Sequence, residues 1–144
     1  MLAITARPSL PSVIALLRQA GLPTEDITAE RVDDFFQAGE PQAPVGIVGL
    51  ELSPPYALLR SLVVAPSARS SGLGSRLLAH AETHARSRGV RSLYLLTTTA
   101  EAFFAARGYV RADRNDAPPA IRSSAEFSAL CPASAAFMVK KLAE

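Results

Sequence analysis

The feature that most constrains this chain is an apolar segment that runs into a glycine-bearing turn and then into a helical pattern. Tyr56 to Ala65 is the most strongly apolar stretch and predicts a buried strand. The turn Arg69-Ser70-Ser71-Gly72-Leu73-Gly74 follows it. A helix is predicted from about Gly72 to Arg88, because its apolar residues form one stripe and Gly89 is a natural stop. A strand, turn and helix in this order predict a layered α/β domain.

Other segments predict short strands and helices on both sides of this unit. Strands are expected at 2–6, 32–38, 45–52, 93–97, 109–112 and 135–142, and helices at 9–20, 100–107 and 121–130. The turn-like segment Gly39 to Pro44 predicts an antiparallel hairpin, and Pro118-Pro119 is expected to interrupt regular structure. The predicted fold class is therefore α/β, with a mixed, mostly antiparallel sheet flanked by helices.

Composition narrows the class of protein. The 144 residues are most simply one domain, residues 1–144, and 49% hydrophobic against 19% charged residues suits a compact fold. The net charge of +2 and the absence of long basic runs argue against a nucleic-acid partner. No apolar stretch is long enough for a membrane span, and the first residues do not resemble a secretory signal. A cytoplasmic location is expected.

The turn itself suits an anion. The first turn of a helix carries N–H groups without intrahelical acceptors and a partial positive charge, and glycines let a bulky anion approach the backbone. Arg69 can add a charge-assisted contact to phosphate oxygens. A plain strand-to-helix connection is the alternative. The turn lacks the Gly-Lys-Ser/Thr ending of a Walker loop, and its glycine spacing does not match the dinucleotide fingerprint.

Two longer segments carry a family resemblance. Leu62 to Leu78 resembles motif A of the GCN5-related N-acetyltransferase (GNAT) family, and Thr97 to Tyr109 resembles motif B. Four segments are also similar to the short acetyltransferases associated with arsenic-resistance genes: Gly49 to Glu51, Leu58 to Val64, Leu95 to Ala100 and Glu126 to Pro132. The resemblance covers nearly the whole chain.

The resemblance implies a fold with two splayed central strands and a site for acetyl-CoA, with no metal. It implies that the backbone of Leu62, Val63 and Val64 holds the pantetheine arm and the thioester. The residues implied around the pyrophosphate are Arg69, Ser70, Ser71, Gly72, Gly74 and Ser75. The implied reaction is transfer of an acetyl group to the primary amine of a small molecule.

The sequence departs from the family pattern in its catalytic positions. The motif B asparagine falls at Thr97, and the frequent tyrosine acid falls at Phe104, which has no proton to donate. The resemblance still implies that Thr97 and Phe104 contact coenzyme A, with a core position as the alternative for Phe104. Some relatives carry a glutamate base where this chain has Leu59, so Glu51 is the first candidate base and Glu126 a weaker one. An exposed carboxylate at a hairpin end is the alternative for Glu51. Because Phe104 cannot act as the acid and no base is obvious, the alternative function is a coenzyme A-binding sensor or interaction module.

Three arginines are candidates for binding the acceptor. Arg60 lies in an apolar segment, where a guanidinium is unusual, and it is expected either to bind a substrate carboxylate or to form a structural ion pair. Arg114 and Arg122 are expected to join it. The acceptor would then be an amino-acid-like amine, and the arsenic association suggests an arsenical or phosphinic glutamate mimic. The expected assembly is a monomer or homodimer.

Three other residues suggest chemistry that we consider less favoured. His80 and His84 lie one helical turn apart but match no complete metal motif, and His84, at the flank of the apolar stripe of its helix, is expected to pack there. Cys131 is the single cysteine, which excludes an intramolecular disulfide, and a buried structural role is expected for it.

Overall fold

The computed structural model describes residues 3–69, 71–130 and 134–142. These residues form two compact units, and neither is one continuous segment of the chain. Unit 1 contains residues 1–51 and 59–84, and unit 2 contains residues 52–58 and 85–144. Strand β4 and helix α2 each contribute residues to both units.

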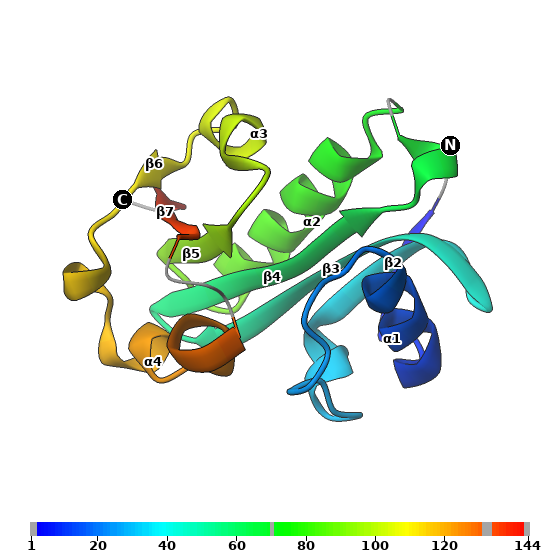
Figure 1. The fold of residues 1–144 in the computed structure, drawn as a ribbon, viewed down its shortest axis with the longest axis horizontal. Helices are drawn as coiled ribbons and strands as arrows, with labels where there is room; N and C mark the ends of the chain where they lie inside the picture. The colour runs from blue at the N-terminus through cyan, green and yellow to red at the C-terminus, as the bar shows by residue number, and fades with distance from the viewer. Residues whose placement is uncertain (1–2, 70, 131–133, 143–144) are drawn as a thin grey trace. The chain divides into compact units, whose positions relative to one another are not determined.

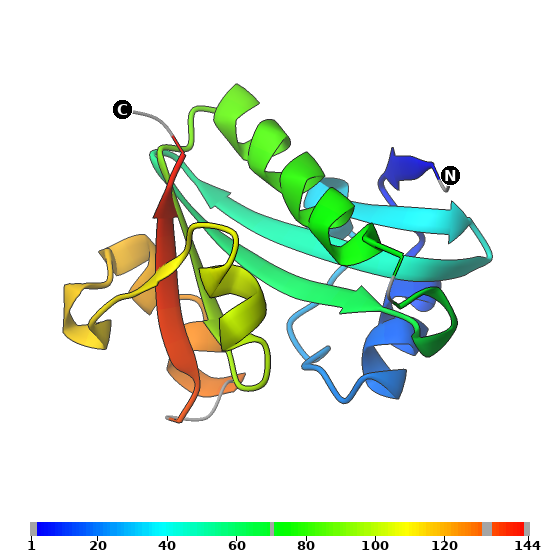
Figure 2. The same cartoon turned by 90° about the horizontal axis from the view of Figure 1, so that it is seen from above.

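Unit 1 contains four strands and a helix on each face of them (Figures 1 and 2). Its elements are β1 (Ile4–Ala6), α1 (Leu10–Gln19), the 3₁₀ helix η1 (Arg31–Asp34), β2 (Phe35–Glu40), β3 (Ala43–Ser53), β4 (Tyr56–Val64), the 3₁₀ helix η2 (Pro66–Ala68) and α2 (Leu73–Ser87). Strands β1, β2 and β3 pair antiparallel in sequence order, and β4 follows β3 in the sheet. The predicted hairpin is confirmed, although its strands continue to Glu40 and resume at Ala43.

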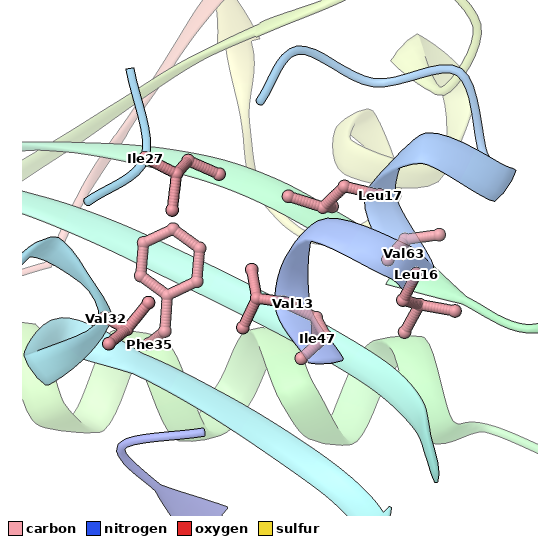
Figure 3. Close-up of a cluster of buried hydrophobic side chains, with 8 residues drawn as sticks. All are labelled: Val13, Leu16, Leu17, Ile27, Val32, Phe35, Ile47 and Val63. Atoms are coloured by element: carbon pink, nitrogen blue, oxygen red, sulfur yellow. The ribbon is translucent and has the colours of Figure 1, made fainter. Parts of the chain in front are cut away.

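The core of unit 1 lies between α1 and the sheet. Phe35 is fully buried among residues of α1, β3 and β4, as Figure 3 shows. The cluster consists of Val13, Leu16, Leu17, Ile27, Val32, Phe35, Ile47 and Val63. On the other face, a Cβ on Gly46 would lie 2.8 Å from a methyl carbon of Leu77, so glycine allows α2 to pack closely on β3.

Unit 2 contains the first residues of β4 and the C-terminal half of the chain. Its further elements are β5 (Ser92–Thr97), α3 (Glu101–Ala105), β6 (Val110–Arg111), the 3₁₀ helix η3 (Arg114–Asp116), α4 (Pro119–Arg122), the π-helix η4 (Glu126–Leu130) and β7 (Ala136–Lys141). Strand β5 pairs in parallel with β4 from Tyr56↔Ser92 to Leu58↔Tyr94, and β7 lies antiparallel between β5 and β6.

The strand order is therefore β1-β2-β3-β4-β5-β7-β6, a mixed and mostly antiparallel seven-stranded sheet. This confirms the predicted fold class. None of the helices in the described part of the chain is long and apolar enough to cross a membrane.

Three predictions were partly wrong. Residues 32–34 belong to η1 rather than to a strand, and the pairing of β2 with β3 begins only at Phe35. Pro119 opens α4 instead of interrupting regular structure, since proline fits the first helical position, where no N–H acceptor is needed. The single helix expected at 121–130 is divided into α4 and η4.

Candidate functional site

The turn between β4 and α2 is braced by its own side chains and backbone. After the short helix η2, the Ser71 hydroxyl donates to the Ala68 carbonyl at 2.6 Å. Gly72 adopts a φ of +79°, which favours glycine, and its carbonyl accepts from the Arg76 N–H at 3.1 Å. The chain thereby turns sharply into α2, and the first N–H groups of this helix point back toward the turn.

The backbone at this turn is open on one side. A Cβ built on Gly72 would meet no atom of the described structure within 4 Å, so the backbone is open on that side. Gly74 and Ser75 lie in the first turn of α2 and are half-buried. Arg69 is exposed, and its Nε donates to the Val64 carbonyl at 3.2 Å, which holds the guanidinium over the end of β4. Ser70 lies outside the described residues.

The last residues of β4 alternate between the core and the opposite face. Val63 is buried in the core of unit 1, whereas Leu62 and Val64 are only half-buried. Just before them, Ser61 has a φ of +60°, a left-handed conformation that is rare for a serine within a strand. The strand is therefore irregular directly beside the segment that was predicted to hold pantetheine.

A network of four charged side chains lies in unit 1. The Arg60 side chain has no solvent exposure, and its Nη1 contacts a carboxylate oxygen of Asp26 and the Oε2 of Glu51, the latter at 2.9 Å. Glu51 Oε1 contacts Arg31 Nη1, also at 2.9 Å. Arg60 Nε donates to the Ser61 hydroxyl at 3.1 Å, which ties the network to the irregular point of β4.

This network changes the interpretation of two predicted residues. Arg60 is held by two carboxylates of its own chain, which agrees with the structural ion pair that was its alternative role. Glu51 is not an exposed hairpin carboxylate, because its side chain is only 16% exposed and both oxygens contact guanidinium groups. Leu59, at the position of the glutamate in some relatives, is buried.

Sequence reasoning missed Asp26 and Arg31. The signal was indirect: an arginine within an apolar strand needs carboxylate partners when it is buried. Their identity could not be read from spacing, since Asp26 lies in the connection between α1 and η1, far from Arg60 in the sequence.

In unit 2, the two motif B positions have structural roles. The Thr97 hydroxyl oxygen accepts from the Ala100 N–H at 3.0 Å at the end of β5. Phe104 is buried and packs edge-to-face against Phe103 and Tyr109, with ring centroids 5.1 and 5.5 Å away. Phe104 is therefore a core residue of unit 2.

Arg114 and Arg122 hold the late segments of unit 2 together. Arg114 Nη2 donates to the Ala135 carbonyl at 2.8 Å, and its guanidinium lies over the Phe127 ring. Arg122 Nη2 donates to the Asn115 carbonyl at 2.7 Å. Glu126 is buried. Cys131 lies outside the described residues.

His80 and His84 pack on the ring of Phe36, with ring centroids 4.6 and 5.0 Å away. Burial, with a smaller contribution from the charge of His84, lowers the pKa of His80 below its ordinary value. His84 Nε2 lies 3.5 Å from an Asp34 oxygen. Within residues 3–69, 71–130 and 134–142, no three His, Cys, Asp or Glu side chains gather in a way that could hold a metal ion.

Comparisons with known proteins relate this arrangement to acyl transfer. An amino-acid acetyltransferase of Ralstonia nicotianae is 46% identical over 57 residues, which is 40% of this chain and 13% of that protein. The structure of N-acetylglutamate synthase from Neisseria gonorrhoeae, complexed with coenzyme A and N-acetyl-glutamate, superposes with a TM-score of 0.83 at 23% identity. That match covers 100% of this chain and 36% of the synthase. The chain thus matches only a minor part of the length of these relatives.

A GNAT-family acetyltransferase from Staphylococcus aureus Mu50 superposes with a TM-score of 0.73 at 17% identity, covering 99% of both chains. At such identities, the solved structures establish a shared fold. The model of the acetyltransferase (GNAT) family matches residues 12–111, which is well over half of the chain and includes the turn and the charged network. The chain therefore belongs to the GNAT acetyltransferase family.

Proposed function

We propose that this protein is an N-acetyltransferase that uses acetyl-CoA to acetylate the primary amine of a small molecule. The observation that carries the proposal is the open turn at Gly72, which presents the N-terminus of α2 and the exposed Arg69 to an anion. Acetyl-CoA would supply the acetyl group as an activated thioester. The solved relatives that contain coenzyme A support this choice of anion.

The residues proposed to hold the pyrophosphate are those of the turn. Backbone N–H groups at Ser71, Gly72, Gly74 and Ser75 would bind phosphate oxygens, with charge from Arg69. Ser70 is also proposed to contact the pyrophosphate, and only its position in the sequence motif supports this. The backbone of Leu62, Val63 and Val64 would hold the pantetheine arm, and the side chains of Leu62 and Val64 are half-buried.

Besides binding the cofactor, an N-acetyltransferase must remove a proton from the acceptor amine. An alkylamine has a pKa near about 10, so a proton must leave before the amine attacks. Glu51 is the proposed acceptor of that proton, and one of its two contacts with guanidinium groups must then be released. Phe104 cannot protonate the departing thiolate, which would take its proton from water or another group.

The proposed acceptor is amino-acid-like. The support is the identity to named amino-acid acetyltransferases in one segment and the likeness to N-acetylglutamate synthase over the whole chain. An arsenical or phosphinic glutamate mimic is the finer proposal, and it rests on the resemblance to acetyltransferases associated with arsenic-resistance genes.

The experiment is a thiol-release assay with the purified chain and acetyl-CoA. The acceptors are glutamate, other amino acids, phosphinothricin, arsinothricin and a neutral polyamine. We expect release that depends on an amino-acid-like acceptor, and a lower rate in Arg69→Ala than in the control Arg18→Ala, an exposed arginine in α1. Coenzyme A binding without release for any acceptor would contradict the proposal and favour a binding module. Preference for the polyamine would overturn the acceptor class.

A further inference from the structure

Arg31 is fixed at the start of η1 by its backbone. Its N–H donates to the Thr28 carbonyl at 3.1 Å and lies 3.4 Å from the Thr28 hydroxyl oxygen. The next residue, Val32, is buried in the core of unit 1. The position of the Arg31 Cα is therefore determined by a turn on one side and by core packing on the other.

The Arg31 side chain is held through its Nη1, which contacts Glu51 Oε1 at 2.9 Å, while 41% of the side chain is exposed. Glu51 in turn contacts Arg60, whose side chain is completely buried beside Asp26. Charges alternate along this chain of contacts, from Asp26 through Arg60 and Glu51 to Arg31. Its solvent-exposed end is cationic.

From this arrangement we infer that Arg31 binds the carboxylate of the acceptor. A guanidinium has five N–H donors in a planar fork, so a contact through Nη1 leaves an edge that matches a second carboxylate. Because Glu51 and the η1 backbone already hold the side chain, a ligand loses little conformational entropy in ordering it. Glu51 and Arg60 then act as positioning residues for Arg31. The inference rests on the proposed acetyltransferase function.

The charges around Arg31 limit the acceptor further. Glu30 and Asp33 are exposed on either side of it in the sequence, and Asp34 lies 3.5 Å from His84. These carboxylates disfavour a purely anionic ligand and favour one that also carries an ammonium group. The acceptor class indicated is an amino acid in its zwitterionic form.

The experiment compares each amino acid with its α-amide, which keeps the amine but removes the carboxylate. We expect Arg31→Ala to lower kcat/KM for the amino acid about tenfold to a hundredfold, because a hydrogen bond to a charged group is lost. The loss should come from a higher KM for the amino acid, with little change in kcat. The same variant should lower kcat/KM for the amide much less than for the amino acid, and it should leave the affinity for coenzyme A unchanged. Arg31→Lys should recover part of the loss.

Arg18→Ala, another exposed arginine of unit 1, is the matched control and should leave both acceptors unaffected. If Arg31→Ala lowered kcat/KM equally for the amino acid and for its α-amide, the inference would be overturned, while the assignment as an acetyltransferase would stand. Absence of turnover with every acceptor in the wild-type protein would instead contradict the proposed function. Thermal unfolding of each variant separates either result from loss of the fold.

Discussion

At the scale of single residues, the buried Arg60 is the most demanding feature of this protein. Removing a guanidinium from water costs several kcal/mol, and the cost is offset only when carboxylates surround it with good geometry. Asp26 and Glu51 provide this in unit 1, and the Ser61 hydroxyl accepts from the Nε. Losing one of these partners leaves a buried cation that water cannot reach.

The substitution Glu51→Gln tests the two roles given to Glu51. The amide is neutral and offers one oxygen where two guanidinium groups now share a carboxylate. We expect the free energy of unfolding to fall by about 1–3 kcal/mol, measured by urea denaturation. We also expect turnover at neutral pH to drop with amino acids and with their amides, while coenzyme A binding stays intact.

Glu40→Gln is the matched control, since Glu40 is an exposed acid at the end of β2 in the same unit. If Glu51→Gln slows the reaction with amino acids but not with their α-amides, Glu51 positions Arg31 and takes no part in removing the proton from the acceptor amine. Unchanged rates with both kinds of acceptor would exclude Glu51 from the mechanism altogether.

Some of these residues could be found in the sequence and others could not. The left-handed Gly72 was predictable, because a glycine between a strand and a helix marks a turn that other residues rarely adopt. Asp26 and Arg31 could not be found, because their partners Arg60 and Glu51 lie in β4 and β3 and become neighbours only when the chain folds.

At the scale of elements, local signals predicted most of the fold. Gly89, with a φ of +86°, follows the end of α2 as expected, and the strand predicted near the end of the chain is confirmed as β7. The C-terminal region from Pro118 to Leu130 was harder to predict. Its short helices are fixed by contacts with Phe137 and Leu58 in the core of unit 2, which no local periodicity reveals.

The packing of α2 on β2 predicts a pH dependence of stability. The pKa of His80 lies below its ordinary value of 6.5, so in the native state His80 binds fewer protons than in the unfolded chain just below that pH. The free energy of unfolding should therefore decrease as pH falls below about 6.5. Urea denaturation at a series of pH values between about 5 and 8 measures this pH dependence of the free energy of unfolding.

His80→Gln should make this profile flatter, because the substituted side chain does not titrate. Ala79→Gln, at the neighbouring exposed position of α2, should keep the wild-type slope. A His80→Gln profile as steep as that of the wild type would assign the dependence to other groups.

At the scale of the whole molecule, coenzyme A should stabilise the folded chain. A ligand that binds only the native state at about 100 times its Kd adds about 2.7 kcal/mol to the free energy of unfolding. We expect thermal unfolding to shift upward with coenzyme A, and Arg69→Ala to reduce the shift relative to Arg88→Ala, an exposed arginine beyond α2. No shift at saturating coenzyme A would contradict the assignment of the turn.

The division of the chain into two interleaved units also limits how such a protein can be altered. The chain passes between the units after Glu51, after Leu58 and after His84, so each unit is assembled from separated stretches of sequence. No single cut releases either unit intact, and a gene crossover at these points would exchange only part of one. A crossover inside the chain between two different parents would therefore divide at least one unit between them.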